Sequence, residues 1–231
     1  MKLKNIGIYY LAIMALLFSF TARAEIPGGA FNTLHVKAKN VDRYVNYIKR
    51  NTSVFELVGS DIAGVCVTKS GHQYPGEMFV WNAFESIEAA YVGAQKYDPT
   101  VPNNQFEKLR EVKYTATFKP TKEFDLRPGH ERVWKMKLND WRAYSEMMSK
   151  LETALNAEGH DVRIGVFYPL GGGTEVFHVR GITDSASESG KIADQYFAGA
   201  AFGEIWDDSM QYVDEIVSET VEECEIIYTK D

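Results

Sequence analysis

The feature that most constrains this chain is an internal repeat, in which two stretches about 100 residues apart carry the same order of patterns. In residues 34–38 (LHVKA) and 134–138 (WKMKL), apolar residues alternate with histidine or lysine. Each of these short runs precedes a stretch with an apolar residue every three or four positions. Alternation is typical of a strand, and the wider spacing is typical of a helix that packs one face on a sheet. Such a chain folds as two similar units or as one unit built from two similar halves.

The remaining segments extend this correspondence through both halves. Each half continues with a short β-rich run, a turn containing glycine, a second β-rich run, a helical stretch and a closing strand. In order, the matched segments are 64–67 and 165–168, 77–80 and 175–178, and 112–118 and 224–229. The order β-α-β-β-α-β therefore occurs twice, and this is the ferredoxin-like arrangement. We predict an α+β fold with one repeat in residues 25–122 and the other in residues 123–231.

One ferredoxin-like unit leaves one face of its sheet uncovered, and a second sheet can cover it. In this respect the chain resembles the dimeric α+β barrel superfamily, in the variant that fuses two copies in one polypeptide. The resemblance spans residues 30–230 and rests on element order and duplication. It implies two sheets that close into one pseudo-dimeric barrel with helices outside. Members of the superfamily include cofactor-independent monooxygenases, isomerases, haem enzymes and some lyases, so the resemblance implies no single reaction.

The N-terminus has the pattern of a secretory signal peptide. Lys2 and Lys4 precede an uncharged run over residues 6–20, and Ala22-Arg23-Ala24 places small residues around a cleavage point. We predict that residues 1–24 are removed and that the mature protein is soluble and periplasmic or secreted; an uncleaved anchor is the weaker alternative. Cleavage removes three basic residues and no acidic one, which changes the net charge from −7 to −10. This charge argues against binding to nucleic acid or an anionic membrane.

The chain has two cysteines, Cys66 and Cys224. In an oxidising compartment such a pair usually forms a disulfide, although two free buried thiols are the alternative. The resemblance implies that the strands carrying them meet at a joint between the halves, and this favours a disulfide that closes the barrel.

Alternation along the strands sorts residues into a face under the helices and a face toward the barrel interior. On the first strands, His35 and Lys37 share the inward face with Lys135 and Lys137 of the second copy. On the third strands, the pattern predicts Phe79 and Trp81 under the helices. Its predicted inward set is Val80, Asn82, His178 and Arg180.

These inward cations predict an anion site formed by Lys37, Lys135, Lys137 and Arg180, together with Asn82. The predicted ligand is a small anionic organic molecule or an acidic sugar. Buried charges need partners, so interior carboxylates that pair with these cations are the alternative.

The predicted chemistry is proton transfer by His35 or His178, with Tyr168 near the barrel mouth, in a lyase, isomerase or monooxygenase type of reaction. The nearby cations would stabilise negative charge as it develops. No histidine pair has the spacing of a metal-binding helix, so we predict no metal site.

Two alternative functions remain open. The first is noncovalent haem binding, with His35 or His178 as axial ligand, since the attachment motif Cys-x-x-Cys-His is absent. The second is a structural or binding module without catalysis. Apart from the haem alternative, we predict no cofactor. The protein would be a monomer with a pseudo-dimeric barrel, or a homodimer.

Overall fold

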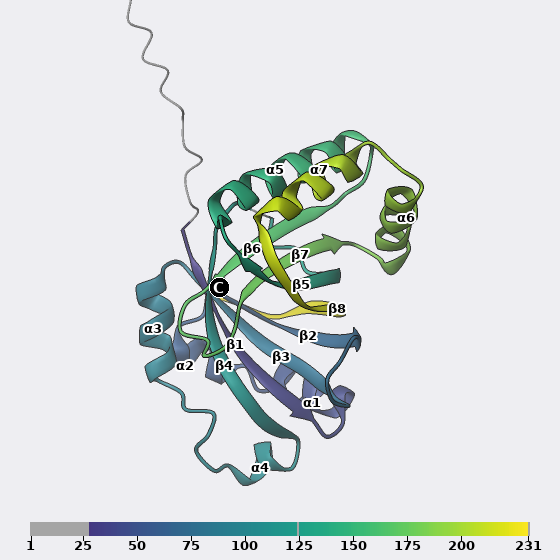
Figure 1. Cartoon of the computed structure of the whole chain (residues 1–231). Helices are drawn as coiled ribbons and strands as arrows, with labels where there is room; N and C mark the ends of the chain where they lie inside the picture. Colours follow the sequence, from purple (N-terminus) through teal and green to yellow (C-terminus); the bar gives the residue numbers. More distant parts are fainter. Residues whose placement is uncertain (1–27, 124, 231) are drawn as a thin grey trace, which may run out of the picture.

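The computed structural model describes residues 28–123 and 125–230 (Figure 1). The elements of the first half are β1 (Ala30–Ala38), α1 (Val41–Lys49), α2 (Ser53–Val58), β2 (Ile62–Ser70), β3 (Glu77–Phe84), α3 (Ile87–Gln95), α4 (Asn104–Glu107) and β4 (Arg110–Pro120). Those of the second half are β5 (His130–Leu138), α5 (Trp141–Ala157), β6 (Arg163–Pro169), β7 (Phe177–Thr183), α6 (Ala186–Phe197), α7 (Phe202–Ser209), η1 (Met210–Tyr212) and β8 (Val213–Thr229). The predicted signal peptide lies outside the described residues.

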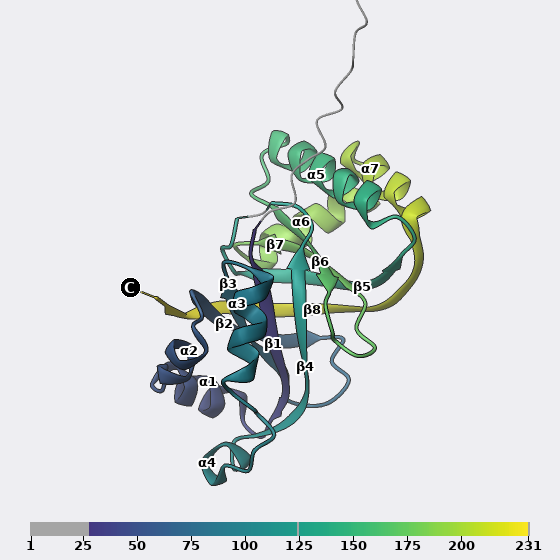
Figure 2. The ribbon, with the colours of Figure 1, turned by 90° about the vertical axis from the view of Figure 1, so that its left-hand side faces the viewer.

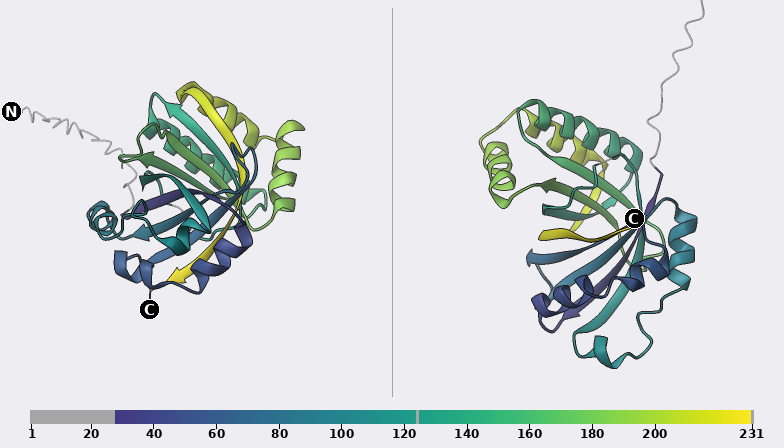
Figure 3. Two further views of the ribbon diagram at one scale, coloured as in Figure 1. Left: turned by 90° about the horizontal axis from the view of Figure 1, so that it is seen from below. Right: turned by 180° about the vertical axis from the view of Figure 1, so that it is seen from behind.

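The strands form one closed antiparallel barrel in the order β1-β3-β2-β8-β5-β7-β6-β4. Both halves use the same internal order, with the first strand between the third and the last. The halves meet at the β2–β8 and β4–β6 pairings. Helices α1–α3 cover the outside of one half and α5–α7 cover the other (Figures 2 and 3). The predicted α+β barrel of two tandem repeats is therefore confirmed. In the ranges that the structure describes, no helix combines the length and apolar character needed to cross a membrane.

The first helices of the two halves begin in the same way. The side chain of Asn40 accepts a hydrogen bond from the Arg43 backbone N–H, and Asp140 caps α5 through the N–H groups of Arg142 and Ala143. Such caps satisfy backbone donors that have no partner inside a helix. The polar residue that follows each first strand thus fixes where the covering helix starts.

Cys66 and Cys224 lie opposite each other at the β2–β8 joint. Their Cα atoms are 4.1 Å apart, and the sulfur atoms form a disulfide with an S–S distance of 2.04 Å. The bond links the two halves directly, at the joint that the resemblance to the barrel superfamily implied.

The strand faces agree with the sequence in three of the four strands that alternation sorted. Under the helices, Val36 and Met136 are buried, while His35 and His178 line a cavity inside the barrel.

The prediction for β3 is wrong: Phe79 and Trp81 face the barrel, and Asn82 lies on the helix side. The register gives the reason, because Phe79 lies opposite His35 whereas His178 lies opposite Lys135. Residues of β3 therefore correspond to residues of β7 that lie 99 positions later, whereas the match of 77–80 with 175–178 in the sequence uses an offset of 98. A shift of one residue turns every side chain of a strand to the opposite face.

Candidate functional site

Inside the barrel, the Glu175 carboxylate collects three hydrogen-bond donors. It accepts bonds from Lys135 Nζ at 2.8 Å, from His178 Nε2 at 2.6 Å and from the Tyr114 hydroxyl. Glu175 lies two residues before β7, and its side chain is 7% exposed. Lys135 and His178 are therefore already engaged by one interior carboxylate.

Arg180 is paired in the same way. Its Nη1 donates to the carboxylates of Glu131 and Glu222, the latter at 2.9 Å, and its guanidinium lies 5.1 Å from the centre of the Phe79 ring. All three charged side chains are at most one-tenth exposed. This is the internal pairing that the sequence left open as the alternative to an anion site.

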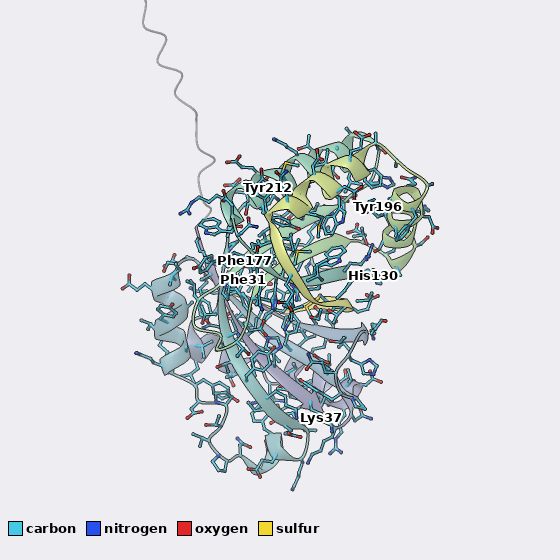
Figure 4. All side chains as sticks on the ribbon, in the orientation of Figure 1. Phe31, Lys37, His130, Phe177, Tyr196 and Tyr212 are labelled. Atoms are coloured by element: carbon cyan, nitrogen blue, oxygen red, sulfur yellow. A yellow bond between two sulfur atoms is a disulfide. The ribbon has the colours of Figure 1, made fainter. Side chains whose placement is uncertain are left out.

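The structure does not bring the remaining predicted cations into this interior cluster. Lys137 is 56% exposed and forms an ion pair with Glu215 at 2.6 Å. Lys37 is half-buried near the end of β1, far from Phe31 at the other end of that strand (Figure 4). The four cations therefore do not form a common anion site, and Asn82 lies outside the barrel interior.

Tyr168 is also separated from the two interior histidines. Its neighbour Phe167 lines the interior cavity, so alternation turns Tyr168 outward, where its ring contacts Trp141 and Phe177 at centroid distances of 5.8 and 5.1 Å. The expectation that Tyr168 stands at the barrel mouth beside His35 or His178 is therefore wrong.

The space left inside the barrel is about 60 Å³. Ring stacking fills much of the rest: His35 lies 4.1 Å from the Tyr114 ring and 5.0 Å from the Phe79 ring, and His178 lies 4.4 Å from Phe118. Organic ligands usually occupy about 300–1,000 Å³, whereas a cavity of this size suits water. The residues around these histidines therefore do not fit a haem.

Hydrogen bonds and burial define the protonation of the interior groups. Burial, reinforced by Lys135, lowers the pKa of His178 to about 4 against the opposing bond to Glu175. Burial, and then Lys135, also places the pKa of His35 well below its usual value. Burial alone would raise the pKa of Glu175, but the bonds from His178 and Lys135 keep it below the usual range. Both histidines are thus neutral near pH 7, and His178 donates its Nε2 proton to an ionised carboxylate.

We expect the free energy of unfolding to fall as the pH is lowered from 6.5 to about 4. In this window the unfolded histidines bind protons that the folded ones exclude, so stability rises with pH. A pKa of about 4 for His178 corresponds to a change of about 3 kcal/mol, and His35 acts in the same direction. Urea unfolding at a series of pH values measures the slope.

The variant His178→Gln keeps a donor for Glu175 and should flatten the slope, whereas His72→Gln, at an exposed turn, should not. His160 does not obscure the result. Its hydrogen bond to Glu188 raises its pKa, so its contribution is lost only as the pH rises above 6.5. An equal slope in wild type and His178→Gln would contradict the assignment.

A larger cavity, about 410 Å³, lies between the sheet and the helices of the first half. Strands β1, β3 and β4 form its floor, and α1, α2 and α3 form its roof. Most of the wall is apolar, with Ile48, Val54, Phe55, Val58 and Val80 among its lining residues. Its volume is within the range of small-molecule sites.

Arg110, the first residue of β4, forms the polar end of this cavity. Its side chain is 6% exposed, and it donates to the hydroxyl groups of Tyr44 and Tyr97, the latter at 2.7 Å. Within residues 28–123 and 125–230, no carboxylate forms an ion pair with it, and its buried Nε has no hydrogen-bond partner. Because an arginine side chain stays protonated in proteins, the cavity contains a buried charge without a counter-charge.

Asn82 belongs to this same cavity, and its buried Oδ1 has no hydrogen-bond partner among the described residues. A wide surface depression shares Tyr97, Phe106 and Arg110 with the cavity and gives a route to Arg110 from solvent. Nothing in the local sequence around Arg110 distinguishes it from an arginine in contact with solvent at the start of a strand. Its counterpart in the second half, Val213, is identified only by the register of the strands, so the repeat in the sequence did not reveal the difference either.

Comparison with known proteins identifies the fold alone. No protein-family model and no curated protein matches this sequence. Among solved structures, an anthrone oxidase-like protein is 12% identical, with a TM-score of 0.54 over 88% of this chain and 95% of the other. A variant of the chlorite dismutase from Candidatus Nitrospira defluvii is 9% identical, with a TM-score of 0.51 over 85% of this chain and 91% of the other. At these identities the likeness extends to the arrangement of strands and helices.

Proposed function

We propose that this dimeric α+β barrel protein binds a small organic carboxylate in the sheet–helix cavity of its first half. The observation that carries the proposal is the buried guanidinium of Arg110, which lies at the end of a 410 Å³ cavity and forms an ion pair with no carboxylate among the described residues. An isolated buried charge destabilises a fold by several kcal/mol, so a ligand that supplies the missing negative charge is favoured there.

The donors around Arg110 suit a carboxylate. Arginine has five N–H donors in a planar arrangement, and the Nε of Arg110 has no hydrogen-bond partner in the part of the chain that the structure describes. The hydroxyl groups of Tyr44 and Tyr97 accept bonds from Arg110, so their own protons remain available for an anion. A carboxylate beside Arg110 can therefore accept bonds from the guanidinium and both tyrosines.

The opposite part of the cavity defines the rest of the ligand. Apolar residues of α1 and α2 face Val80 across it, so an apolar body gains about 25 cal/mol for each Å² removed from water. The free Oδ1 of Asn82 can accept one hydrogen bond from a ligand hydroxyl or N–H group. The proposed ligand is thus an apolar acid, optionally with one donor group on its body.

Binding without turnover is the form of this proposal that the cavity supports best. Asp98 is the one carboxylate, and no histidine is present, among the described residues that line it. Hydrogen bonds from Thr100 lower the pKa of Asp98, which makes it a weak base. The interior histidines, predicted as bases, line a different cavity, inside the barrel.

We also propose that the protein is exported and acts as a monomer. The signal-like pattern of residues 1–24 supports export, and the Cys66–Cys224 disulfide suits an oxidising compartment. Strands of a single chain close the barrel, so a second copy is not needed to complete it. The mass of protein purified from the periplasm or medium would show whether 24 residues are lost.

We expect Arg110→Met to weaken carboxylate binding by about tenfold to a hundredfold, the value of a hydrogen-bonded charge. Calorimetry and thermal shifts with decanoate and 4-phenylbutyrate, each beside its neutral primary amide, measure the effect. The acids should raise the Tm of the wild type, and the amides should not.

The matched control is Arg43→Met, which removes an exposed arginine from α1 and should leave binding unchanged. Arg110→Met should remain folded, because methionine fills similar space and removes an uncompensated charge. Equal binding of acids and amides, or acid binding that survives Arg110→Met, would contradict the proposal.

A further inference from the structure

We infer a second ligand site in the other half of the molecule, for a neutral apolar small molecule. A cavity of about 270 Å³ lies between the sheet and helices of the second half. Its floor includes Trp134 and Val179, and its roof includes Met148 of α5, Ala193 of α6 and Trp206 of α7. This site is separate from the Arg110 cavity and does not depend on the function proposed for it.

The two cavities occupy equivalent places in the repeat. On the sheet side, Leu34 lies opposite Val80 in the first half, as Trp134 lies opposite Val179 in the second. The lining residues of the two cavities correspond in sequence as well, at an offset of 100 residues in the helices and 99 in the third strands. These pairs are Ile48 and Met148, Phe55 and Leu155, Val80 and Val179, and Asn82 and Gly181.

The charge that distinguishes the first cavity is missing from the second. Arg110 lies opposite Ala38 on β1, and Val213 lies opposite Leu138, the equivalent residue of β5. Valine therefore stands where the first half has its buried cation. Glycine likewise stands where the first half has the amide of Asn82.

The tyrosines of the first helices show the same divergence. Tyr44 and Tyr144 are both fully buried, but the Tyr44 hydroxyl contacts Arg110, whereas the Tyr144 hydroxyl lies 3.5 Å from the sulfur of Met136. A carboxylate in the second cavity would lose its hydration, and the cation on the wall, Arg132, is already paired with Glu219, so this cavity selects against acids.

The charged residues that line the second cavity are already paired with each other. Arg132 donates to Glu219 at 2.5 Å and lies over the Trp134 ring at 4.8 Å. The remainder of the wall is mostly aliphatic and aromatic, and the Trp134 and Trp206 rings lie 5.0 Å apart. A neutral aromatic or aliphatic molecule suits such a wall.

The backbone at Gly181, on the wall of this cavity, could accept a larger side chain that would fill part of the space. A Cβ atom there would meet the Trp134 ring at 3.6 Å, an ordinary contact, and its φ is not in the left-handed region. Neither strain nor a clash therefore calls for glycine. The cavity is also larger than the 150 Å³ apolar cavity that binds benzene in an engineered protein.

The test uses the neutral fluorophore N-phenyl-1-naphthylamine, whose emission rises in apolar surroundings and which accepts energy from tryptophan. The wild type should bind it, with quenching of Trp134 and Trp206 emission. Gly181→Leu and Ala193→Phe fill the cavity from opposite walls, and each should weaken binding at least tenfold.

Two controls separate this site from the rest of the molecule. Gly190→Leu adds the same side chain at an exposed position of α6 with no neighbour within 4 Å, and it should bind the probe normally. Arg110→Met should also bind the probe normally, while its binding of decanoate is weakened as described above. A melting curve of each filling variant establishes that it is folded, and one folded variant is sufficient.

Failure of the wild type to bind the probe would overturn the inference. Unchanged binding in a folded Gly181→Leu or Ala193→Phe protein would also overturn it, because the probe would then occupy another place. Neither result bears on carboxylate binding at Arg110, which the acids and amides test by themselves.

Discussion

Replacing Arg180 by alanine is expected to lower the free energy of unfolding by about 3–5 kcal/mol. Arg180 is the cation between the buried carboxylates of Glu131 and Glu222, which lie opposite each other on β5 and β8. Removing it leaves two like charges out of water with no cation between them. Urea or guanidinium unfolding at pH 7 measures the loss.

The pH dependence of this variant is a second signature. Burial raises the pKa of Glu131, and Arg180 acts against that rise. Without Arg180 the pKa of Glu131 in the folded protein rises further. The variant is therefore most stable at low pH, where Glu131 is protonated, and loses stability as the pH rises through the pKa of Glu131. The destabilisation should therefore grow from pH 5 to pH 8.

Matched variants show whether pairing is the cause. Lys137→Ala breaks an exposed ion pair with Glu215 and should change stability by less than about 1 kcal/mol. Adding Glu131→Gln and Glu222→Gln to Arg180→Met should recover most of the loss, because neither carboxylate is then left charged. A loss below 1 kcal/mol in Arg180→Ala would mean that the carboxylates find another partner or are reached by water.

The second large effect is expected from the disulfide. Replacing both Cys66 and Cys224 by alanine removes a link between residues 158 positions apart. In the chain-entropy model such a link stabilises the fold by about 5 kcal/mol, through its effect on the unfolded chain. Guanidinium unfolding of the double variant should give a free energy of unfolding that is lower by about that amount, and therefore a lower midpoint.

Reduction of the wild type should give the same midpoint as the double variant, because both remove the link and leave the β2–β8 ladder in place. A reductant that has no effect on the wild type would indicate that the bond does not form. Two titratable thiols in the unreduced protein would lead to the same conclusion.

Several features of this protein were determined by the sequence itself. The duplicated order of strands and helices, the helix starts after Ala38 and Leu138, and the inward faces of β1, β5 and β7 all come from local patterns. Local patterns are sufficient here because the side-chain periods of helices and strands, and the polar caps between them, are properties of neighbouring residues.

The tertiary structure decided the features that depend on distant residues. Asn82 lies under the helices because β3 and β7 correspond at an offset one residue larger than the offset that aligns their sequences. Tyr168 lies outside the barrel because Phe167 takes the inward place. No local pattern contains a register between strands, and one residue is enough to reverse a face.

The chemistry of the two interiors was decided in the same way. Lys135 and Arg180 are paired because Glu175, just before β7, and Glu131 and Glu222, on the adjacent strands β5 and β8, reach them. Arg110 has no ion pair because no carboxylate that the structure describes reaches it. A sequence shows that a cation is present. Whether that cation destabilises the fold, pairs with a carboxylate or binds a ligand depends on which groups surround it after water is removed. That environment exists only once the barrel has closed.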